Sequence, residues 1–357
     1  MYGDVNAFQR ATETAIDDLL TRQRRIEAMV EAQGRTVAQT QEALHAHNLH
    51  MDMYSWQLYR QEEESYDDAR QRFFRALPKA TDELRLYQLA CTRLMQDFHA
   101  TCEKLDLPYW SMYGTLLGAV RHGGFIPWDD DMDVGMLRSD IATLKSAMEN
   151  DERYRVTEVY DWFVHCRQIR FAYRDESIPC FIDLFIFDLS TLPADEAHKR
   201  IVEDHESMAR DMNASERLAA WNRDNPLVAA HDDLGAVIAE CFDAKVAQEY
   251  APRGFLTHER QEARSVAYSV DNMGWQPGAP TAHDYDDIFP TQSLVFEGVE
   301  IAGPHEPLSV LKQSFGDYYQ LPNDIDSYSY HITDEKLKSG ETRKALEGLL
   351  DQNDLTA

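Results

Sequence analysis

Apolar residues recur every seven positions near the N-terminus, which is the period of a helix that presents one stripe to a partner helix. The second core position of each heptad is mostly polar, and no proline occurs before Pro78. We therefore expect residues 1–80 to form a long helix or a helical hairpin with an imperfect, coiled-coil-like repeat. The stripe consists of Val30, Val37, Leu44, Met51 and Leu58.

The stripe has three uses that the sequence leaves open. It can join two copies of the chain, dock another protein, or fold back on the rest of the chain. A homo-oligomer formed through these helices is one of the partners we expect.

Beyond Pro78 the hydrophobic pattern changes to that of a globular domain with both helices and strands. Thr81 precedes a helical pattern that runs from Leu84 to Lys104, and a polar, loosely held tail follows Glu335. Strands are expected at 155–160, 162–173 and 180–187, helices at 194–222 and 234–250, and an acceptor loop from Pro252 to Pro290. These patterns predict an α/β (α+β) domain over 81–334, with a mixed sheet flanked by helices, and a tail over 335–357.

Four aspartates crowd into five positions, at 129, 130, 131 and 133. Their mutual repulsion costs several kcal/mol unless a cation lies among them, and oxygen ligands suit Mg²⁺ or Mn²⁺. In a strand, Asp129, Asp131 and Asp133 would point to one face and Asp130 to the other. The cluster therefore predicts a divalent metal site.

A glycine turn precedes this cluster. Gly114 and Thr115 lead from an apolar run into a helix-like segment, and such a turn presents N–H groups to an anion such as phosphate. An anion cradle beside a metal site is the pair of features that phosphoryl transfer needs.

Two other interpretations of the cluster are weaker. A solvated acidic turn is disfavoured because apolar residues flank the aspartates on both sides. A calcium loop of the EF-hand type requires glycine at its sixth position and glutamate at its twelfth, where this chain has Val134 and Asp140.

Asp183 stands alone in the apolar run from Phe181 to Phe187, which is typical of a buried strand. A charged carboxylate there is costly unless it is paired or coordinated. It is either a metal ligand or general base, or a hydrogen-bonded residue at an exposed strand end. Asp188 is expected to be a turn residue at the end of the strand.

These residues resemble the LicD family, whose relatives include fukutin and fukutin-related protein. The resemblance rests on GTLLGAVRHGGFIPWDDDMDVG at 114–135, with weaker motifs in the same order over roughly 84–332. The later motifs are CFIDLFIFD at 180–188, Ile288–Pro290, the hairpin-like LVFEGVEI at 294–301, FGDYYQLP at 315–322, and His331.

The resemblance implies a nucleotidyltransferase-like fold and the transfer of a phospho-alcohol from a CDP-activated donor to a glycan. Choline, ribitol and glycerol are the alcohols of such donors, and a bacterial cell-surface polysaccharide is the implied acceptor. Asp131 and Asp133 then correspond to the paired metal ligands and Asp183 to the third carboxylate, with Asp129 as an additional ligand. Gly114 and Thr115 correspond to the superfamily's Gly-Ser turn.

Other residues near the cluster are candidates for substrate binding. Arg121 is the favoured phosphate contact, the alternative being a surface ion pair with an aspartate. His122 is either a phosphate donor or a packed ring. Tyr113 and Trp128 suit a quaternary ammonium group, although aromatic residues at such positions are more often core.

Arg167 and Arg170 fall on opposite faces of one expected strand. At most one of them should therefore reach the site.

The composition of the chain restricts the classes of partner that it is expected to bind. The net charge of −28 argues against nucleic acid and anionic lipid, and no apolar run is long enough for a transmembrane helix. The five cysteines are scattered and the N-terminus lacks a signal-peptide pattern. We expect a cytoplasmic protein, peripheral to a membrane-bound polysaccharide assembly machinery.

Two further function classes stay open. A nucleotidyltransferase that moves NMP from an NTP would use the same turn and carboxylates but release pyrophosphate. A non-catalytic scaffold would use the N-terminal helices as its working part.

Overall fold

The computed structural model describes residues 53–161, 166–224, 227–271, 281–321 and 332–351, together with individual positions between 22 and 51. Several expected features lie wholly or partly outside these residues, namely Trp162 at the start of a strand, part of the segment before Pro290, Pro322 and His331. The chain divides into two compact units, Met1–Arg72 and Phe73–Ala357.

The first unit is helical at its described positions up to Tyr59, which agrees with the heptad pattern. All five residues of the heptad stripe are exposed, and Leu58 reaches 88% exposure. Beyond a short turn, helix α2 (Tyr66–Arg75) begins. Arg72 pairs with Glu64 at 2.8 Å and lies over the ring of Tyr59 at 4.3 Å, so these contacts hold the turn together.

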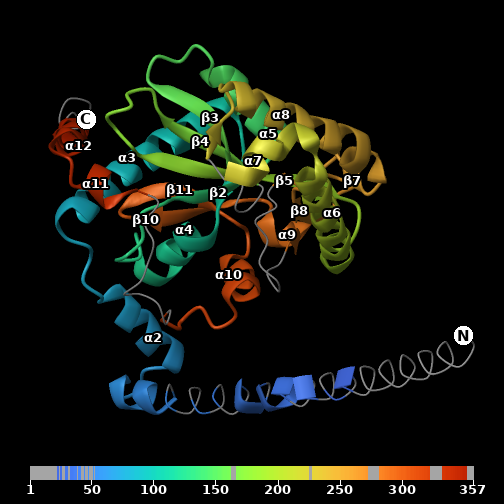
Figure 1. Cartoon of the computed structure of the whole chain (residues 1–357). Coiled ribbons are helices and arrows are strands. Elements are labelled where there is room, and N and C mark those ends of the chain that lie inside the picture. Colours follow the sequence, from blue (N-terminus) through green and yellow to red (C-terminus); the bar gives the residue numbers. More distant parts are fainter. Residues whose placement is uncertain are drawn as a thin grey trace, which may run out of the picture. The chain divides into compact units, whose positions relative to one another are not determined.

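A mixed sheet forms the centre of the second unit (Figure 1). Its main strands are β1 (Tyr109–Ser111), β2 (Asp133–Leu137), β3 (Tyr154–Asp161), β4 (Cys166–Tyr173), β5 (Phe181–Ser190) and β6 (Val228–Ala229). They are ordered β1-β2-β5-β4-β3-β6, with β2 and β5 parallel and the other neighbours antiparallel. The predicted α/β class with a mixed sheet is confirmed.

Alternation along β5 divides the sheet into two faces. Ile182, Leu184 and Ile186 join one core cluster, whereas Phe187 and Leu189 belong to another. Helices α3 (Asp82–Leu105) and α5 (Arg138–Met148) contribute to the first cluster. The opposite face carries α4 (Tyr113–Leu117) and α10 (Pro307–Phe315), drawn below it.

A third core cluster gathers the helices at the far edge of the sheet. They are α6 (Ala194–Ala214), α7 (Ala219–Asp224) and α8 (Asp233–Lys245). Short turns interrupt or extend the helices at Gly118–His122, Glu216–Leu218, Val246–Tyr250 and Ala251–Arg253. No helix among the described residues has the length and apolar character needed to cross a bilayer.

The segment expected to be an acceptor loop contains short strands of the sheet and a short helix among its described residues, which corrects the sequence interpretation there. It contributes β7 (Leu256–Thr257), β8 (Ser265–Tyr268), β9 (Ala282–Asp284) and α9 (Tyr285–Ile288). β8 pairs with β5 and is fully buried. Short strands between glycines and prolines leave too few residues for a period to show.

The expected hairpin is confirmed as β10 (Gln292–Phe296) and β11 (Val299–Gly303). Its two turn residues, Glu297 and Gly298, both have positive φ, at 51° and 85°. Such a two-residue turn matches the twist of an antiparallel pair.

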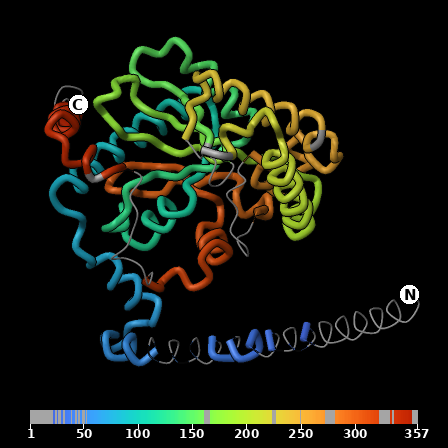
Figure 2. Tube along the Cα trace, viewed as in Figure 1, coloured from blue at the N-terminus to red at the C-terminus, as the bar shows by residue number. Residues whose placement is uncertain are grey.

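The tail is more ordered than its composition suggests. It contains α11 (Asp334–Leu337) and α12 (Gly340–Asp351), and α12 packs beside α3 (Figure 2). Leu337, Leu346 and Leu349 are buried in the main core cluster. The expectation of a loosely held tail is therefore wrong for the described residues 335–351.

Candidate active site

The two carboxylates expected on separate strands lie side by side. Asp133 opens β2 and is the register partner of Asp183 on the parallel strand β5. Neighbouring strands are about 4.8 Å apart, and partners in register project to the same face. The backbone N–H of Asp183 donates to the carbonyl of Met132 at 2.9 Å, which holds the two strands together at this point.

Two further aspartates surround this pair. Burial, followed by the nearby charges of Asp131, Asp183 and Asp129, raises the pKa of Asp133 well above its usual value. Asp133 and Asp183 are 7% and 9% exposed, and Asp131 is half-buried. Asp129, Asp131 and Asp183 therefore lie near enough to Asp133 for their charges to act on it, and these four residues are called the acidic cluster.

The glycine turn supports this acidic cluster from α4. The hydroxyl of Thr115 accepts a hydrogen bond from the N–H of Asp133 at 2.8 Å. A Cβ atom at Gly114 would lie 2.6 Å from Oδ2 of Asp129, so any larger residue would require that carboxylate to shift. The expected phosphate contacts of Gly114 and Thr115 stay predictions.

Asp130 points away from the acidic cluster. It is fully buried, and its Oδ2 accepts a hydrogen bond from the N–H of Ile332 at 2.9 Å. The expected strand alternation does not apply here, because β2 begins only at Asp133. The contact with Ile332 links the aspartate run to the C-terminal part of the chain.

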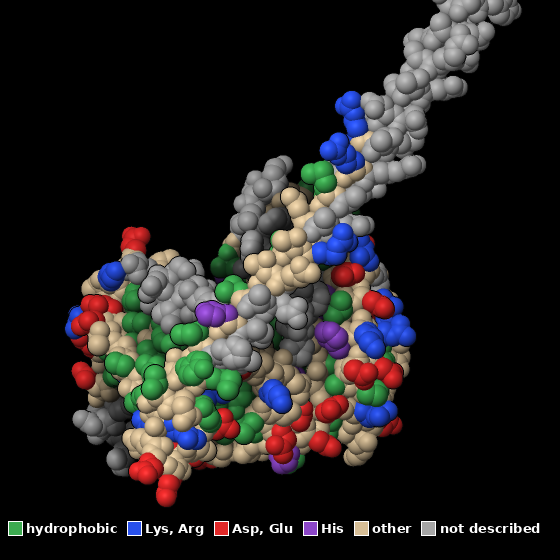
Figure 3. Space-filling view, turned by 90° about the horizontal axis from the view of Figure 1, so that it is seen from below, with side chains coloured by type: hydrophobic (Ala, Val, Ile, Leu, Met, Phe, Trp, Pro, Cys, Tyr) green, Lys and Arg blue, Asp and Glu red, His purple; other side chains and the backbone are tan. Residues whose placement is uncertain are grey.

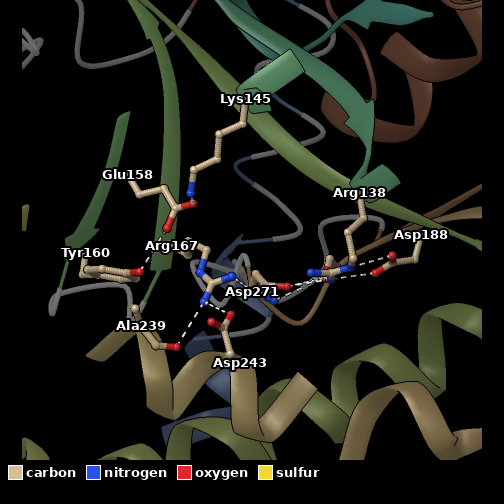
Figure 4. A network of polar contacts seen from close by, with 10 residues as sticks. Arg138, Lys145, Glu158, Tyr160, Arg167, Asp188, Ala239, Asp243 and Asp271 are labelled. Carbon is tan, nitrogen blue, oxygen red and sulfur yellow. Dashed lines mark hydrogen bonds and ion pairs between the residues drawn. The ribbon is translucent and has the colours of Figure 1, made fainter. Parts of the chain in front are cut away.

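Of the two arginines on β4, Arg170 contacts the acidic cluster. Its Nε donates to Oδ1 of Asp183 at 2.9 Å. Arg167 instead pairs with Asp243 at 2.6 Å and with Asp271 at 3.4 Å, as Figure 4 shows. The expectation that at most one of the two arginines reaches the site agrees with these contacts.

Asp188 is not a strand-end turn residue, which corrects the sequence interpretation. It lies within β5 and receives two hydrogen bonds of 2.9 Å from Arg138. The same guanidinium pairs with the buried Asp271 at 2.6 Å, so a charged network joins β5 to the segment that follows β8 (Figure 4).

Arg121 lies in a buried setting, only 2% exposed. Its Nη1 donates to the carbonyls of Tyr318 and Gln320, and its guanidinium lies 4.3 Å from the ring centroid of Phe74. Because Arg121 is buried, it does not fit the alternative to a phosphate contact, which was an ion pair with an aspartate at the surface. Its role as a phosphate contact stays a prediction.

The ring of His122 is packed against aromatic side chains. Burial, with a smaller contribution from the charge of Arg121, lowers the pKa of His122 to about 3, so the ring is neutral near pH 7. Its ring packs edge-on against Phe74 at 5.5 Å and Trp128 at 6.5 Å.

Tyr113 is packed in a similar way. Its ring meets that of Phe185 edge-on at 5.2 Å, and burial raises the pKa of its hydroxyl. These contacts suit core packing, and a substrate contact by Tyr113 or Trp128 stays a prediction.

The chemistry of the acidic cluster fits a hard divalent cation, because its donors are carboxylate oxygens that repel one another. Within the described residues, no three His, Cys, Asp or Glu side chains already stand in a ligand arrangement. A metal site formed by Asp129, Asp131, Asp133 and Asp183 stays a prediction.

Sequence reasoning missed one residue that supports the site, Glu297 in the β10–β11 turn. Its carboxylate pairs with Arg85 at 2.7 Å and Lys79 at 2.6 Å, and accepts from the N–H of Phe125 at 3.1 Å. A Cβ at Gly124 would lie 2.4 Å from its Oε1. Glu297 therefore fastens the loop that leads into the acidic cluster, and a lone glutamate in a hairpin turn gives no sequence signal for this.

One face of the chain is of mixed charge despite the net charge of −28. In the face shown in Figure 3, Lys and Arg side chains lie among the Asp and Glu side chains, and apolar side chains gather between them.

Comparison with known proteins identifies the domain that carries the site. A family model described as LicD/FKTN/FKRP, nucleotidyltransferase domain, matches residues 106–216, which include every site residue predicted above. The lipopolysaccharide cholinephosphotransferase LicD of Haemophilus influenzae is 27% identical over 271 residues, covering 70% of this chain and 96% of that protein.

Shorter matches involve other relatives. The ribitol 5-phosphate transferase FKRP of Homo sapiens is 49% identical over 39 residues, 11% of this chain and 8% of that protein. The uncharacterized protein RP689 of Rickettsia prowazekii is 42% identical over 78 residues, 22% of this chain and 27% of that protein. The resemblance to the LicD family is confirmed by these matches, since residues 106–216 match the model of the LicD/FKTN/FKRP nucleotidyltransferase domain.

Proposed function

We propose that this chain transfers a phospho-alcohol from a CDP-activated donor to a hydroxyl of a cell-surface glycan, with release of CMP. The observation that carries the proposal is the register pairing of Asp133 with Asp183, which places two carboxylates from different strands on one face. The names of the relatives point to phosphocholine or ribitol phosphate as the group transferred. Glycerol phosphate is the third alcohol phosphate to test.

The reaction is a substitution at phosphorus. The acceptor hydroxyl oxygen forms a bond to the phosphorus that carries the alcohol, and the bond from this phosphorus to the oxygen of CMP breaks. CMP leaves with that oxygen, and the hydroxyl proton passes to Asp183 or to water. Bound Mg²⁺ or Mn²⁺ would neutralise charge on the diphosphate.

The residues of the chain divide these tasks. Asp131 and Asp133 would hold the cation, with Asp129 as a further ligand. Asp183 would either complete the metal site or accept the proton. Thr115 holds the start of β2 through the N–H of Asp133, so it keeps that carboxylate in place.

CMP release tests the proposal. The full chain is incubated with Mg²⁺, a bacterial polysaccharide acceptor and, in turn, CDP-choline, CDP-ribitol and CDP-glycerol. We expect CMP from one donor, and loss of at least a hundredfold in rate for Asp131→Asn. Asp175→Asn is the matched control, because Asp175 is an exposed aspartate between β4 and β5.

The same assay separates the competing functions. Pyrophosphate release from an NTP, with no CMP from any CDP donor, would instead favour NMP transfer. Binding of neither CDP donors nor NTPs would favour the scaffold.

We further propose that the heptad stripe of the first unit joins two copies of this chain. Its five residues are exposed, and their seven-residue spacing fits a second helix of the same pitch. Residues 22–59 contain four arginines against three glutamates and one aspartate, so this segment is neutral within a chain of net charge −28. Two copies therefore meet there without net repulsion.

Sedimentation of the full chain tests this association. We expect a dimer that dissociates in Leu44→Asp, whereas Gln39→Asp adds the same charge off the stripe and should stay dimeric. A monomeric wild-type chain at micromolar concentration would refute the association.

A further inference from the structure

Arg170 lies beside the acidic cluster and contacts one of its carboxylates. It lies on β4 and is the register partner of Asp183 on the antiparallel strand β5. The Nε–Oδ1 distance is 2.9 Å, and the two side chains are 20% and 12% exposed. The guanidinium therefore lies on the same face of the sheet as the carboxylates, close to solvent.

Two other contacts fix the orientation of the guanidinium. Its Nη2 donates to Oε1 of Gln168 at 3.0 Å. Its plane lies over the ring of Phe181, 4.0 Å from the centroid. An arginine held at three points is a pre-organised cation, because little side-chain freedom is left to lose when it binds an anion.

The other candidate arginines are engaged elsewhere. Arg121 donates to the carbonyls of Tyr318 and Gln320, and Arg167 pairs with Asp243 and Asp271. Of the three arginines that the sequence singled out, Arg170 is the one with an observed contact to the acidic cluster.

The negative charge of the acidic cluster and of a bound diphosphate requires more than one positive group. A single divalent cation cannot neutralise both the carboxylates of the acidic cluster and a diphosphate bound beside them. A second positive group is needed near the diphosphate, and the planar guanidinium matches phosphate oxygens in a bidentate way.

Resting on the proposed function, we propose that Arg170 is a binding residue for the donor diphosphate and exchanges partners when the metal binds. Before binding, it pairs with Asp183. A divalent cation then competes for the Asp183 oxygen, and the guanidinium turns to the diphosphate. Arg170 therefore weakens binding of the metal alone and strengthens binding of the donor.

Direct binding measurements test the exchange without relying on turnover. Binding of Mn²⁺ alone is followed by its electron paramagnetic resonance signal, and binding of CDP-choline and of CDP is followed by calorimetry at saturating Mn²⁺. CDP reports the diphosphate contact even when choline is not the alcohol of the natural donor.

The two substitutions are Arg170→Gln, which removes the charge, and Arg170→Lys, which keeps it but loses the bidentate fork. For Arg170→Gln we expect Mn²⁺ to bind about fivefold more tightly and CDP roughly tenfold to a hundredfold more weakly. Arg170→Lys should lie between Arg170→Gln and wild type for CDP. Arg155→Gln is the control, because Arg155 lies on β3 and pairs with Glu176 at 3.0 Å.

The outcomes separate the inference from the proposed function. A wild-type chain that binds neither Mn²⁺ nor CDP refutes both. Wild-type binding of both ligands, with unchanged CDP affinity in Arg170→Gln, overturns the role of Arg170 alone. Weaker Mn²⁺ binding in Arg170→Gln also overturns this role. That result would mean that Arg170 holds Asp183 in place for the metal rather than competing with the metal. If Arg170→Gln does not fold, by circular dichroism, Arg170→Lys decides by the same criteria.

Discussion

Asp133 and Asp183 lie side by side as register partners near the beginning of the parallel strands β2 and β5. The 49 residues between them along the chain include two antiparallel strands, β3 and β4, and helix α5. Strand pairing, rather than sequence proximity, brings the two carboxylates together. Their proximity is unfavourable by itself, which is the usual condition of a site built for a charged ligand.

Removing one charge of this pair should stabilise the fold. In Asp133→Asn the repulsion from Asp131, Asp183 and Asp129 falls, so we expect a gain of about 1 kcal/mol in the free energy of unfolding without added metal. Urea unfolding at pH 7 measures it. Equal stability or a loss would mean that the carboxylates do not repel one another in the folded chain.

The ion pairs of Glu297 should make stability depend on pH. Although burial opposes it, hydrogen bonds from Arg85 and Lys79 lower the pKa of Glu297 from 4.5 to about 2. A lowered native pKa stabilises the fold above pH 4.5, and this contribution is lost as the pH falls from 4.5 towards 2.

Glu297→Gln removes that contribution. We expect the variant to be less stable than wild type by roughly 2 kcal/mol at pH 7, with the difference shrinking at pH 3. Urea unfolding of both proteins at the two pH values measures this. Glu300→Gln is the control, since Glu300 is exposed on the neighbouring strand β11. A difference that is the same at both pH values would contradict the account.

Gly135 lies in β2 against a buried tryptophan. A Cβ there would lie 2.4 Å from the ring of Trp110, which is fully buried, so Gly135→Ala should destabilise the fold by about 3 kcal/mol. Gly348→Ala is the matched change in helix α12, where nothing lies within 4 Å of the added atom, and it should stabilise by about 0.5–1 kcal/mol. Thermal unfolding of both variants checks the opposite signs.

The C-terminal helix α12 should contribute to the stability of the whole second unit. Leu346 is 1% exposed in the core cluster that α12 shares with α3, so Leu346→Ala should cost roughly 2–4 kcal/mol. Lys344→Ala, at an exposed position of the same helix, should change little. A near-wild-type midpoint for Leu346→Ala in urea would show that the tail is loosely held after all.

Sequence patterns predicted the elements that are long or strongly patterned. Helix α3 begins at Asp82, next to the predicted start, and β5 covers the run around Asp183. The carboxylates of the site were identifiable because an isolated aspartate in an apolar strand and a dense acidic run both stand out against their surroundings.

Interactions between distant parts of the chain were not predictable in the same way. Arg121 is near the aspartates in sequence, yet it contacts carbonyls at positions 318 and 320. Leu346 and Leu349 belong to one apolar stripe within a mostly polar segment. The stripe is buried only because the segment packs against α3. Tertiary contacts decide such cases, and a local pattern carries no record of them.

A double-mutant cycle on CMP release tests the central claim that Asp133 and Asp183 act in one site. The rate is measured with Mg²⁺ and the active CDP donor for wild type, Asp133→Asn, Asp183→Asn and the double variant. The account predicts that each single change lowers the rate at least a hundredfold and that the double variant is no worse than the slower single one. Full activity in Asp183→Asn, or losses that simply multiply in the double variant, would contradict it.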